Sequence, residues 1–466
     1  MSDSMNQKEV SLDEFKNESC KECRDLILED DCNTTVCGRC ASADGCNTKA
    51  FGDCSHAEGC STKAVGDCSH SEGNNTTAGE TNSHAEGCAT KALGNCSHSE
   101  GNSTIAYADS SHAEGYNTKT RGNYSHAEGY LNEANGETSH AQGVRTKAEG
   151  YASFSEGGYT TARGDYSSAE GYSTTAEAFA SHSEGDYTSA KGSYSHAEGY
   201  STTATGSYSH AEGGYTTTEG YAAHAEGYST AARAPFSHSE GYYTDTKAYN
   251  GAHIMGLYGD ADTAYSWFLG GGTSSERALA AKILYTGDAY IRNAWYAGGT
   301  DYAEMFKSVG GVVIDPGYFV TLEGELIRIA NENDKFILGV TSVSSGFVAN
   351  NNELGARESY LTSSWGKLQY EEVIVPEKVD KDGNVLVQEH TIKQPILGAS
   401  QSTASSQSCG MTAVAILGQV LVRDDGTCLP NGYCLPNSEG IATNSSDGYR
   451  VMKRVSDNQV LIFFRG

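Results

Sequence analysis

The sequence is poor in proline, in long apolar runs and in basic side chains. Only 6 of its 466 residues are proline and 37% are hydrophobic, which excludes a set of large apolar cores. With 32 basic against 60 acidic side chains, the net charge of -28 disfavours nucleic acid and anionic membrane surfaces as partners. No run approaches the roughly 20 apolar residues of a membrane helix, and residues 1–21 lack a signal-peptide pattern. We therefore expect no nucleic-acid partner, no membrane insertion and no export signal.

Cysteine is abundant at one end, since 11 of the 14 cysteines precede Ser97. Two pairs, Cys20-x-x-Cys23 and Cys37-x-x-Cys40, have a spacing compatible with a zinc knuckle or ribbon, although other cysteines nearby compete as ligands. These four cysteines are the zinc site that the sequence suggests. Residues 1–40 are predicted to be an attachment segment or a flexible leader.

The most informative pattern is an internal repeat of 14 residues. The motif Ser-His-Ala-Glu-Gly recurs at this period, and Phe154 and Ser168 occupy the two places where its histidine is missing. The histidines of the motif are His56, His70, His84, His98, His112, His126, His140, His182, His196, His210, His224 and His238. A fixed period of this kind indicates stacked structural units, each resting on its neighbours.

Each repeat contains two short strand-like segments separated by glycine turns, because a second motif, Thr-x-Ala-x-Gly, lies between successive copies of the first. Alternate residues of a strand share a face, so Ser55, Ala57 and Gly59 are predicted to point inward while His56 and Glu58 point outward. Only small side chains then fill the interior. The sequence predicts an all-β fold with a thin parallel β-roll over residues 41–250, about 65 Å long at the usual strand spacing.

The outward residues of the roll allow more than one interpretation. Histidine and glutamate two residues apart could hold a metal ion, or could form a polar ladder of hydrogen-bonded side chains. Stacked tyrosines such as Tyr194 and Tyr208 could bind sugar rings or be purely structural. Cysteines one repeat apart, such as Cys54 and Cys68, are placed for cross-linking between repeats or between chains.

The glycine-punctuated repeats resemble the head repeats of trimeric autotransporter adhesins over about residues 41–250. That resemblance implies a trimeric parallel β-roll. Oligomerisation is also expected on physical grounds, because a lone roll with so few long aliphatic side chains buries little apolar surface.

After Gly251 the pattern breaks, and residues 251–300 are predicted to be a connector to a mostly β domain at 301–466. That domain opens with Asp-Tyr-Ala-Glu-Met-Phe at residues 301–306, followed by Gly-Tyr-Phe-Val-Thr-Leu at 317–322 and Ile-Leu-Gly-Val-Thr-Ser at 337–342. These segments resemble the glutamic-peptidase autoprocessing domain of phage pre-neck appendage proteins. The resemblance implies an intramolecular chaperone that assists trimer assembly and then removes itself.

For this chain, the resemblance implies cleavage between Thr300 and Asp301, with Asp301 and Glu304 as the catalytic pair. Two carboxylates can divide the work, one accepting a proton from water and the other protonating the leaving amide nitrogen. Their spacing lets them converge in a turn or across a trimer interface, and the sequence leaves this open.

The sequence thus predicts a homotrimeric surface or tail-spike protein of a virion or cell surface, which cuts itself once per chain and requires no cofactor for that step. Two alternatives stay open. The C-terminal domain could remain as a permanent cap on an adhesin-like protein that binds a glycan or cell-surface receptor, or the cysteines could cross-link the chain into a surface layer.

Overall fold

The computed structural model describes residues 33–350, 360–379, 385–387, 389–397 and 410–465. It divides into two compact units, Met1–Arg292 with Pro376–His390, and Asn293–Val375 with Thr391–Gly466. Within the described residues the secondary structure is β throughout, apart from a 3-10 turn at Val309–Gly311. The predicted all-β class is therefore confirmed.

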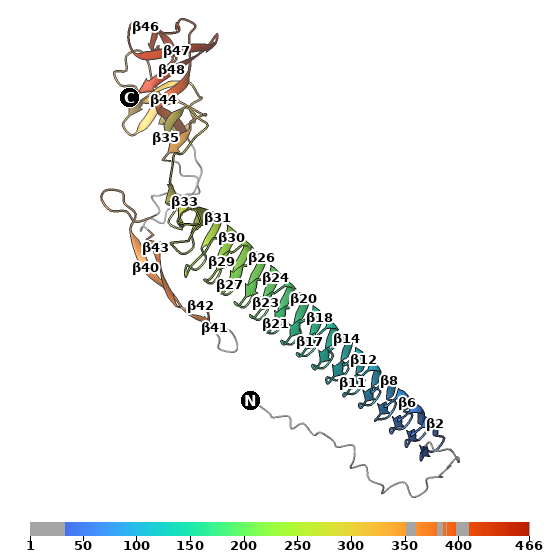
Figure 1. Ribbon diagram of the computed structural model, residues 1–466. Helices are drawn as coiled ribbons and strands as arrows, with labels where there is room; N and C mark the ends of the chain where they lie inside the picture. The colour runs from blue at the N-terminus through green and yellow to red at the C-terminus, as the bar shows by residue number, and fades with distance from the viewer. Residues whose placement is uncertain (1–32, 351–359, 380–384, 388, 398–409, 466) are drawn as a thin grey trace. The chain divides into compact units, whose positions relative to one another are not determined.

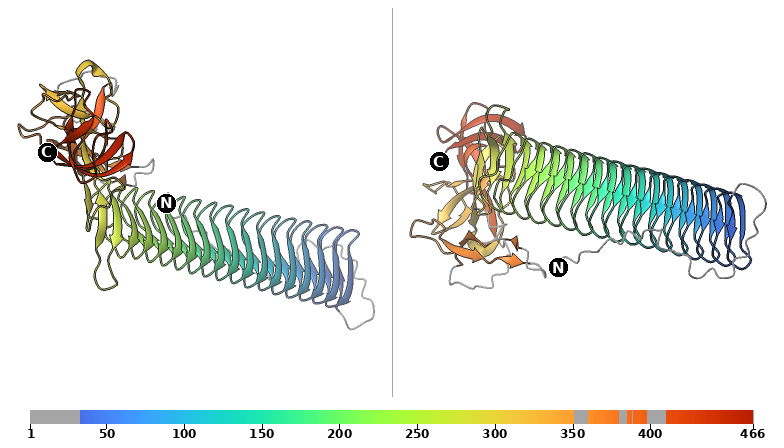
Figure 2. Two further views of the ribbon diagram at one scale, coloured as in Figure 1. Left: turned by 90° about the horizontal axis from the view of Figure 1, so that it is seen from above. Right: turned by 60° about the horizontal axis from the view of Figure 1, so that its bottom comes forward.

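The first unit is a parallel solenoid whose repeats each contribute one long and one short strand (Figures 1 and 2). The long strands are β2 (Ser42–Cys46), β4 (His56–Cys60), β6 (His70–Asn74), β8 (His84–Cys88), β10 (His98–Asn102), β12 (His112–Tyr116), β14 (His126–Tyr130), β16 (His140–Val144), β18 (Phe154–Gly158), β20 (Ser168–Tyr172), β22 (His182–Asp186), β24 (His196–Tyr200), β26 (His210–Gly214), β28 (His224–Tyr228) and β30 (His238–Tyr242). The short strands are β1 (Thr35–Val36), β3 (Lys49–Ala50), β5 (Lys63–Ala64), β7 (Thr77–Ala78), β9 (Lys91–Ala92), β11 (Ile105–Ala106), β13 (Lys119–Thr120), β15 (Glu133–Ala134), β17 (Lys147–Ala148), β19 (Thr161–Ala162), β21 (Thr175–Ala176), β23 (Ser189–Ala190), β25 (Thr203–Ala204), β27 (Thr217–Thr218) and β29 (Ala231–Ala232).

The register of the solenoid follows the sequence period, because each strand pairs in parallel with the strand one repeat further on. His98 lies opposite His112, and Glu100 lies opposite Glu114. Identical motif positions therefore form columns that run along the stack. The short strands make a second, 15-stranded parallel sheet.

Small side chains fill the space between the two sheets, as the alternation predicted. Ser55, Ala57, Thr62 and Ala64 are all at most 1% exposed. Where serine replaces the alanine of the motif, its hydroxyl pairs with a threonine across this thin interior, as between the Ser71 and Thr76 oxygens, which lie 2.8 Å apart. The pairing matters because an unpaired buried hydroxyl would cost free energy. The histidines and glutamates of the motif lie on the outer face of the long strands.

The glycine that closes each motif is required by both conformation and space. Gly59 has a φ of 112°, and a Cβ atom placed on it would lie 2.1 Å from the carbonyl oxygen of Gly73 in the next repeat. Any other residue would be strained and would separate the two repeats. The same contact recurs along the stack, and it explains why the motif retains glycine at this position.

The solenoid continues beyond residue 250, where the sequence prediction ended it. Strand β31 (His253–Leu257) pairs in parallel with β30, with His253 opposite His238, and β32 (Trp267–Gly271) pairs in parallel with β31. The connector prediction for residues 251–300 is therefore wrong in its first part. One extra residue in the preceding turn shifts the histidine to position 253, and the turn absorbs it without breaking the stack. Strands β33 (Leu279–Ile283) and β34 (Ala289–Ile291) then add antiparallel to the end.

The second unit is built on a 10-stranded, mostly antiparallel sheet around the 13-residue strand β44 (Met411–Arg423). Its other strands are β35 (Asp301–Lys307), β36 (Phe319–Glu323), β37 (Leu326–Ile329), β38 (Gly339–Thr341), β39 (Phe347–Ala349), β45 (Tyr433–Pro436), β46 (Ala442–Ser445), β47 (Tyr449–Ser456) and β48 (Gln459–Arg465). A small sheet pairs β40 (Tyr370–Val375) with β43 (His390–Pro395), and another, within the segment that belongs to the first unit, pairs β41 (Lys378–Val379) with β42 (Val385–Val387).

Large apolar side chains return in this second unit, as their frequency after residue 301 predicted. Phe319, Val422, Ile462 and Phe464 are 0% exposed, and Tyr449 stacks against both phenylalanines. This core holds β36, β44 and β48 together and so fixes the position of β35, which pairs with β44. Among the described residues, no helix has the length and apolarity needed to cross a membrane.

Candidate functional site

Asp301 is the first residue of β35, a strand held on both sides. It pairs antiparallel with β44, where Asp301 lies opposite Gly418, and parallel with β39. Along β35 the burial alternates, so that Asp301 and Ala303 are buried while Tyr302 and Glu304 are partly exposed. The alternation is that of an extended strand. The structure therefore places the predicted cleavage site at the edge of the folded domain, inside a sheet rather than in a loop.

Asp301 is 6% exposed, and only one of its two carboxylate oxygens has a hydrogen-bond partner among the described residues. Its Oδ2 atom accepts a hydrogen bond from the Ser345 hydroxyl at 2.7 Å, whereas Oδ1 is buried without a hydrogen-bond partner among the described residues. The backbone carbonyl of Asp301 accepts a hydrogen bond from the Gly346 N–H at 2.9 Å. A buried polar oxygen with no partner is costly and uncommon, and such groups concentrate where a protein performs chemistry.

The Thr300–Asp301 peptide group is held by β44. The N–H of Gln419 donates to the carbonyl oxygen of Thr300 at 3.1 Å, and the Thr300 hydroxyl donates to the Gln419 carbonyl at 2.7 Å. A donor on the Thr300 carbonyl would stabilise negative charge that develops on this oxygen during attack on the carbonyl carbon. The bond is thus fixed and polarised in the direction that hydrolysis requires.

Gly418 makes this close approach of β44 feasible. Its φ is 117°, and a Cβ atom at this position would lie 2.5 Å from the Thr300 carbonyl oxygen and 2.9 Å from the Cα atom of Asp301. Only glycine adopts this conformation readily and leaves room for the peptide group. Gly418 therefore belongs to the candidate site, although it is absent from the residues predicted from the sequence.

Glu304 lies on the other face of β35 from Asp301. One of its carboxylate oxygens accepts a hydrogen bond from the Tyr302 hydroxyl at 3.2 Å, and the Tyr302 ring stacks on Phe347 at 5.5 Å. Burial, together with the neighbouring Glu304 carboxylate, raises the pKa of Tyr302, which keeps its proton available for this bond. Three residues of strand span roughly 10 Å, so the two carboxylates of one chain do not meet on one peptide bond.

Of the two predicted ways of convergence, a turn does not occur in this chain, because residues 301–307 form a strand.

The sequence signals for the remaining site residues differ in strength. A glycine followed by a polar residue inside an apolar strand-like run, as at Gly418 and Gln419, marks a close backbone approach and could have been recognised. Ser345 carries no such signal, because only folding brings it to Asp301.

The predicted zinc cysteines are only partly described. Cys20 and Cys23 lie outside the described residues, Cys37 is disulfide-bonded, and Cys40 is an exposed free thiol. A disulfide sulfur is not a thiolate ligand, so this state of Cys37 offers no support for zinc. The zinc site stays a prediction. Cys54 and Cys68 are also exposed free thiols, not cross-linked to each other.

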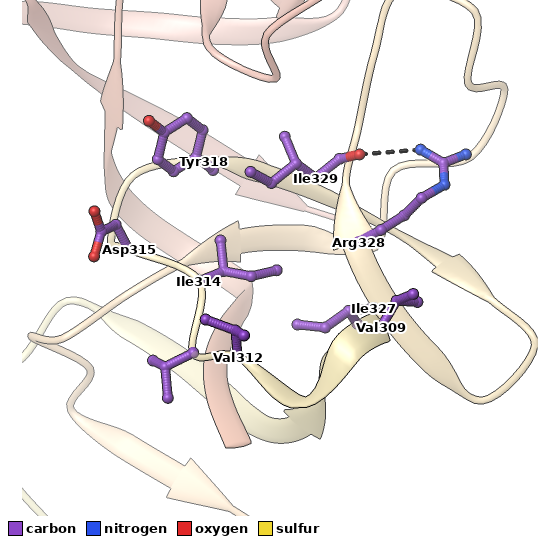
Figure 3. Close-up of a pocket in the computed structure, with 9 residues that line it drawn as sticks. Val309, Val312, Ile314, Asp315, Tyr318, Ile327, Arg328 and Ile329 are labelled. Atoms are coloured by element: carbon purple, nitrogen blue, oxygen red, sulfur yellow. Dashed lines mark hydrogen bonds between the residues drawn. The ribbon is translucent and has the colours of Figure 1, made fainter. Parts of the chain in front are cut away.

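A pocket of about 700 Å³ lies elsewhere in the second unit (Figure 3). Val312, Ile314, Ile327 and Ile329 contribute apolar side chains to its wall, and Arg328 donates to the Ile329 carbonyl at 3.0 Å. Neither Asp301 nor Glu304 lines it. The candidate cleavage site is therefore a feature of the β35–β44 pairing and not of this pocket.

The fold and the site together define a fibrous β-solenoid protein with a candidate processing site in its C-terminal domain. Comparison with known proteins agrees: residues 262–459 match the family described as Peptidase_G2, IMC autoproteolytic cleavage domain. The matched segment contains β35, β44 and all the site residues described above. The resemblance predicted from the motifs of the C-terminal domain is confirmed.

Two of the similar proteins come from Bacillus phages. The chain is 31% identical over 195 residues to the pre-neck appendage protein of phage B103, covering 42% of this chain and 21% of that protein. It is 31% identical over 156 residues to the pre-neck appendage protein of phage phi29, covering 33% and 17%. The crystal structure of the pre-mature phi29 gene product 12 aligns with a TM-score of 0.47 and 18% identity, over 91% of this chain and 55% of that one. The chain thus spans about a fifth of the length of these relatives.

Proposed function

We propose that this chain is a virion tail-appendage protein that assembles as a homotrimer and cuts itself once, between Thr300 and Asp301. The observation that carries the proposal is the match of residues 262–459 to an autoproteolytic cleavage domain, within which the Thr300 carbonyl accepts the Gln419 N–H beside a buried, half-satisfied Asp301. The C-terminal domain acts during assembly, and the solenoid is the lasting product.

The proposed reaction is hydrolysis of one peptide bond. The Glu304 carboxylate of a neighbouring chain accepts a proton from water as the water oxygen bonds to the Thr300 carbonyl carbon. The Gln419 N–H stabilises the resulting oxyanion. The bond to the Asp301 nitrogen then breaks, and the Asp301 carboxyl, which belongs to the residue that carries the leaving nitrogen, supplies its proton. The products are a carboxylate at Thr300 and a free amine at Asp301.

Placing the base on a second chain couples cleavage to assembly. An isolated chain holds its Asp301 and Glu304 on opposite faces of β35, and so lacks a complete site. Release of the C-terminal domain would then follow correct association and would be irreversible.

Intact-mass spectrometry of the purified full-length chain over time tests the proposal. We expect the 49.3 kDa chain to give way to two fragments, one ending at Thr300 and one beginning at Asp301. The near-isosteric changes Asp301→Asn and Glu304→Gln should each slow this conversion by about 100-fold or more, the range of general acid–base contributions. An exposed carboxylate outside the site, changed by Glu325→Gln, is the matched control. A wild-type chain that stays whole under conditions where it is trimeric would overturn the proposal.

A second function is favoured by the aromatic columns at the solenoid turns. Five tyrosines, each 45–53% exposed, follow one another edge to face along the stack: Tyr159, Tyr172, Tyr187, Tyr200 and Tyr215. We propose that these columns offer ring faces to a glycan receptor, since tyrosine presents a flat apolar surface with a polar tip. Binding to a glycan array that survives removal of the C-terminal domain would support this function, and no binding by the trimer would remove it.

A further inference from the structure

The outer face of the long-strand sheet carries two uninterrupted columns of histidine. One runs from His56 to His140 and the other from His182 to His253, with Phe154 and Ser168 between them. Neighbouring rings are close, as between His84 and His98 at 4.7 Å and between His196 and His210 at 4.6 Å. Each column therefore concentrates imidazole nitrogens at the spacing of the strands.

A column of carboxylates runs beside each histidine column. The histidine Nε2 atom and the glutamate Oε2 atom two residues on are 3.3 Å apart at His182 and Glu184, and 3.6 Å apart at His84 and Glu86. Two ligands of a tetrahedral zinc ion with bonds near 2.0–2.1 Å are roughly 3.3 Å apart. The existing separation therefore matches that of a ligand pair with little rearrangement.

At most repeats the histidine Nε2 atom on this face lacks a hydrogen-bond partner within the described chain, whereas those of His56 and His182 pair with the glutamate two residues on. The Nε2 atoms of His84, His98, His112, His196 and His210 are buried by their neighbours and accept or donate no hydrogen bond. Buried polar atoms are almost always satisfied by protein, water or an ion. Because these unpartnered nitrogens recur at equivalent positions of successive repeats, they are a general feature of this face of the solenoid.

Several groups on this face offer three ligand atoms within 4.8 Å of one another. These groups include His84 with Glu86 and His98, His98 with Glu100 and His112, His112 with Glu114 and His126, His182 with Glu184 and His196, and His196 with Glu198 and His210. Each joins two successive repeats, so a bound ion would tie one repeat to the next.

Of the five groups, that of His182, Glu184 and His196 has the ring orientation most suitable for binding one metal ion. Two parallel rings cannot both direct a nitrogen lone pair at one ion between them, and most pairs are nearly parallel, such as His84 and His98 at 3°. The His182 and His196 rings meet at 87°. The column therefore accommodates two neighbouring imidazole rings at a right angle. In the groups whose rings are nearly parallel, one ring must rotate in the same way before both can bind one ion.

The electrical environment also suits a cation. Glu184 and Glu198 lie within the same groups of ligand atoms as His196, so carboxylate charge lies beside an ion bound there. The chain's net charge of -28 attracts cations to its surface. Imidazole with carboxylate is a ligand set that suits zinc and other late divalent ions of the first row.

We propose that the histidine face of the solenoid binds Zn²⁺, with His182, Glu184 and His196 as its first site. Two groups that share a histidine exclude each other, because each neutral ring has one lone pair. The five groups named above therefore hold at most three ions at once, two in the first column and one in the second. This inference is independent of the proposed self-cleavage.

Equilibrium dialysis and isothermal titration of the full-length chain with Zn²⁺ test the proposal. The thiols are first blocked with N-ethylmaleimide, because the exposed cysteines near the N-terminus would also bind zinc. Co²⁺ serves as a spectroscopic probe: ligation by nitrogen and oxygen gives visible bands without the near-ultraviolet charge-transfer band of a thiolate.

The chain itself offers conservative substitutions for this test. Phe154 already stands in the histidine column and Gln142 in the glutamate column, so His196→Phe and Glu184→Gln fit the fold. Ser168→His adds an imidazole beside Glu170 at a repeat that lacks one. Glu177→Gln removes the same charge from an exposed turn outside the column and is the matched control.

We expect His196→Phe and Glu184→Gln to weaken binding at the second column by about tenfold or more, as even lost outer-sphere partners do. Ser168→His should raise the number of bound ions, and Glu177→Gln should change neither number nor affinity. Circular dichroism in EDTA verifies that each variant is folded. Absence of Zn²⁺ binding by the thiol-blocked wild type, or equal binding by wild type and His196→Phe, would overturn the proposal.

Discussion

At the scale of single residues, the candidate site depends on side chains and backbone positions that stabilise a strained arrangement. Asp301 keeps one buried carboxylate oxygen unpaired among the described residues, while Ser345 and Gly346 bind its other polar atoms. Gly418 adds a left-handed conformation at the point of closest approach. Such costs are tolerated only where surrounding structure enforces them, here the sheet around β44.

Gly418→Ala tests whether this close approach matters. We expect it to lower the free energy of unfolding of the C-terminal domain by at least about 2 kcal/mol, because alanine meets both the φ penalty and the Thr300 carbonyl. Chemical denaturation in a Glu304→Gln background, where the chain stays whole, measures the loss. Gly426→Ala is the control: Gly426 has a φ of 91°, but a methyl group there would meet no described atom within 4 Å, so only about 1 kcal/mol should be lost. Equal losses would mean that the contact with Thr300 contributes nothing.

At the scale of strands and repeats, the histidine column makes the solenoid sensitive to acid. Burial, and then the neighbouring His253 and His224, lower the pKa of His238 to about 4. The same direction holds for His70, His112, His126, His196, His224 and His253. The carboxylates shift in both directions, since the pKa of Glu114 is raised to about 7 and that of Glu240 is raised, whereas those of Glu100 and Glu226 are lowered.

The sign of the effect follows from proton linkage. Below pH 6.5 the unfolded chain binds protons at these histidines more readily than the folded chain does, and for His238 this difference extends to about pH 4, so stability falls as the pH falls. We expect the melting temperature of the solenoid in EDTA to drop by roughly 5 °C or more from pH 7 to pH 4.5. His238→Phe should reduce the slope in a calorimetric pH series, whereas Tyr242→Phe, a neighbour on the same strand, should not. A melting temperature that rises over this interval would contradict the assignment.

Much of the solenoid could be predicted from the sequence, because its contacts are local. A repeat of 14 residues places each strand beside its own copy, so the inward alanines and outward histidines follow from alternation alone. The final repeats were missed because one inserted residue before His253 interrupts the spacing while the turn absorbs it. The arrangement around Asp301 is different: its partners Ser345 and Gly418 lie 44 or more residues away, and only the folded sheet unites them.

At the scale of the whole molecule, the geometry of one chain leaves the proposed reaction incomplete. Strand β35 directs Asp301 and Glu304 to opposite faces. In a chain that acts alone, the Thr300–Asp301 bond therefore lies beside Asp301 but out of contact with Glu304, the proposed base. In the proposed homotrimer, a neighbouring chain supplies the missing carboxylate. This arrangement makes a distinctive prediction for mixed assemblies.

Chains carrying Asp301→Asn and chains carrying Glu304→Gln should each be inert when alone, yet a co-refolded mixture should cut. In the mixture, the Glu304→Gln chain keeps its own Asp301 and receives Glu304 from an Asp301→Asn neighbour. Isotope labelling of one variant, followed by intact-mass spectrometry, shows which chain is cut, and only the Glu304→Gln chain should be. An inert mixture that still forms trimers would place both carboxylates in one chain, which would require β35 to rearrange before the reaction.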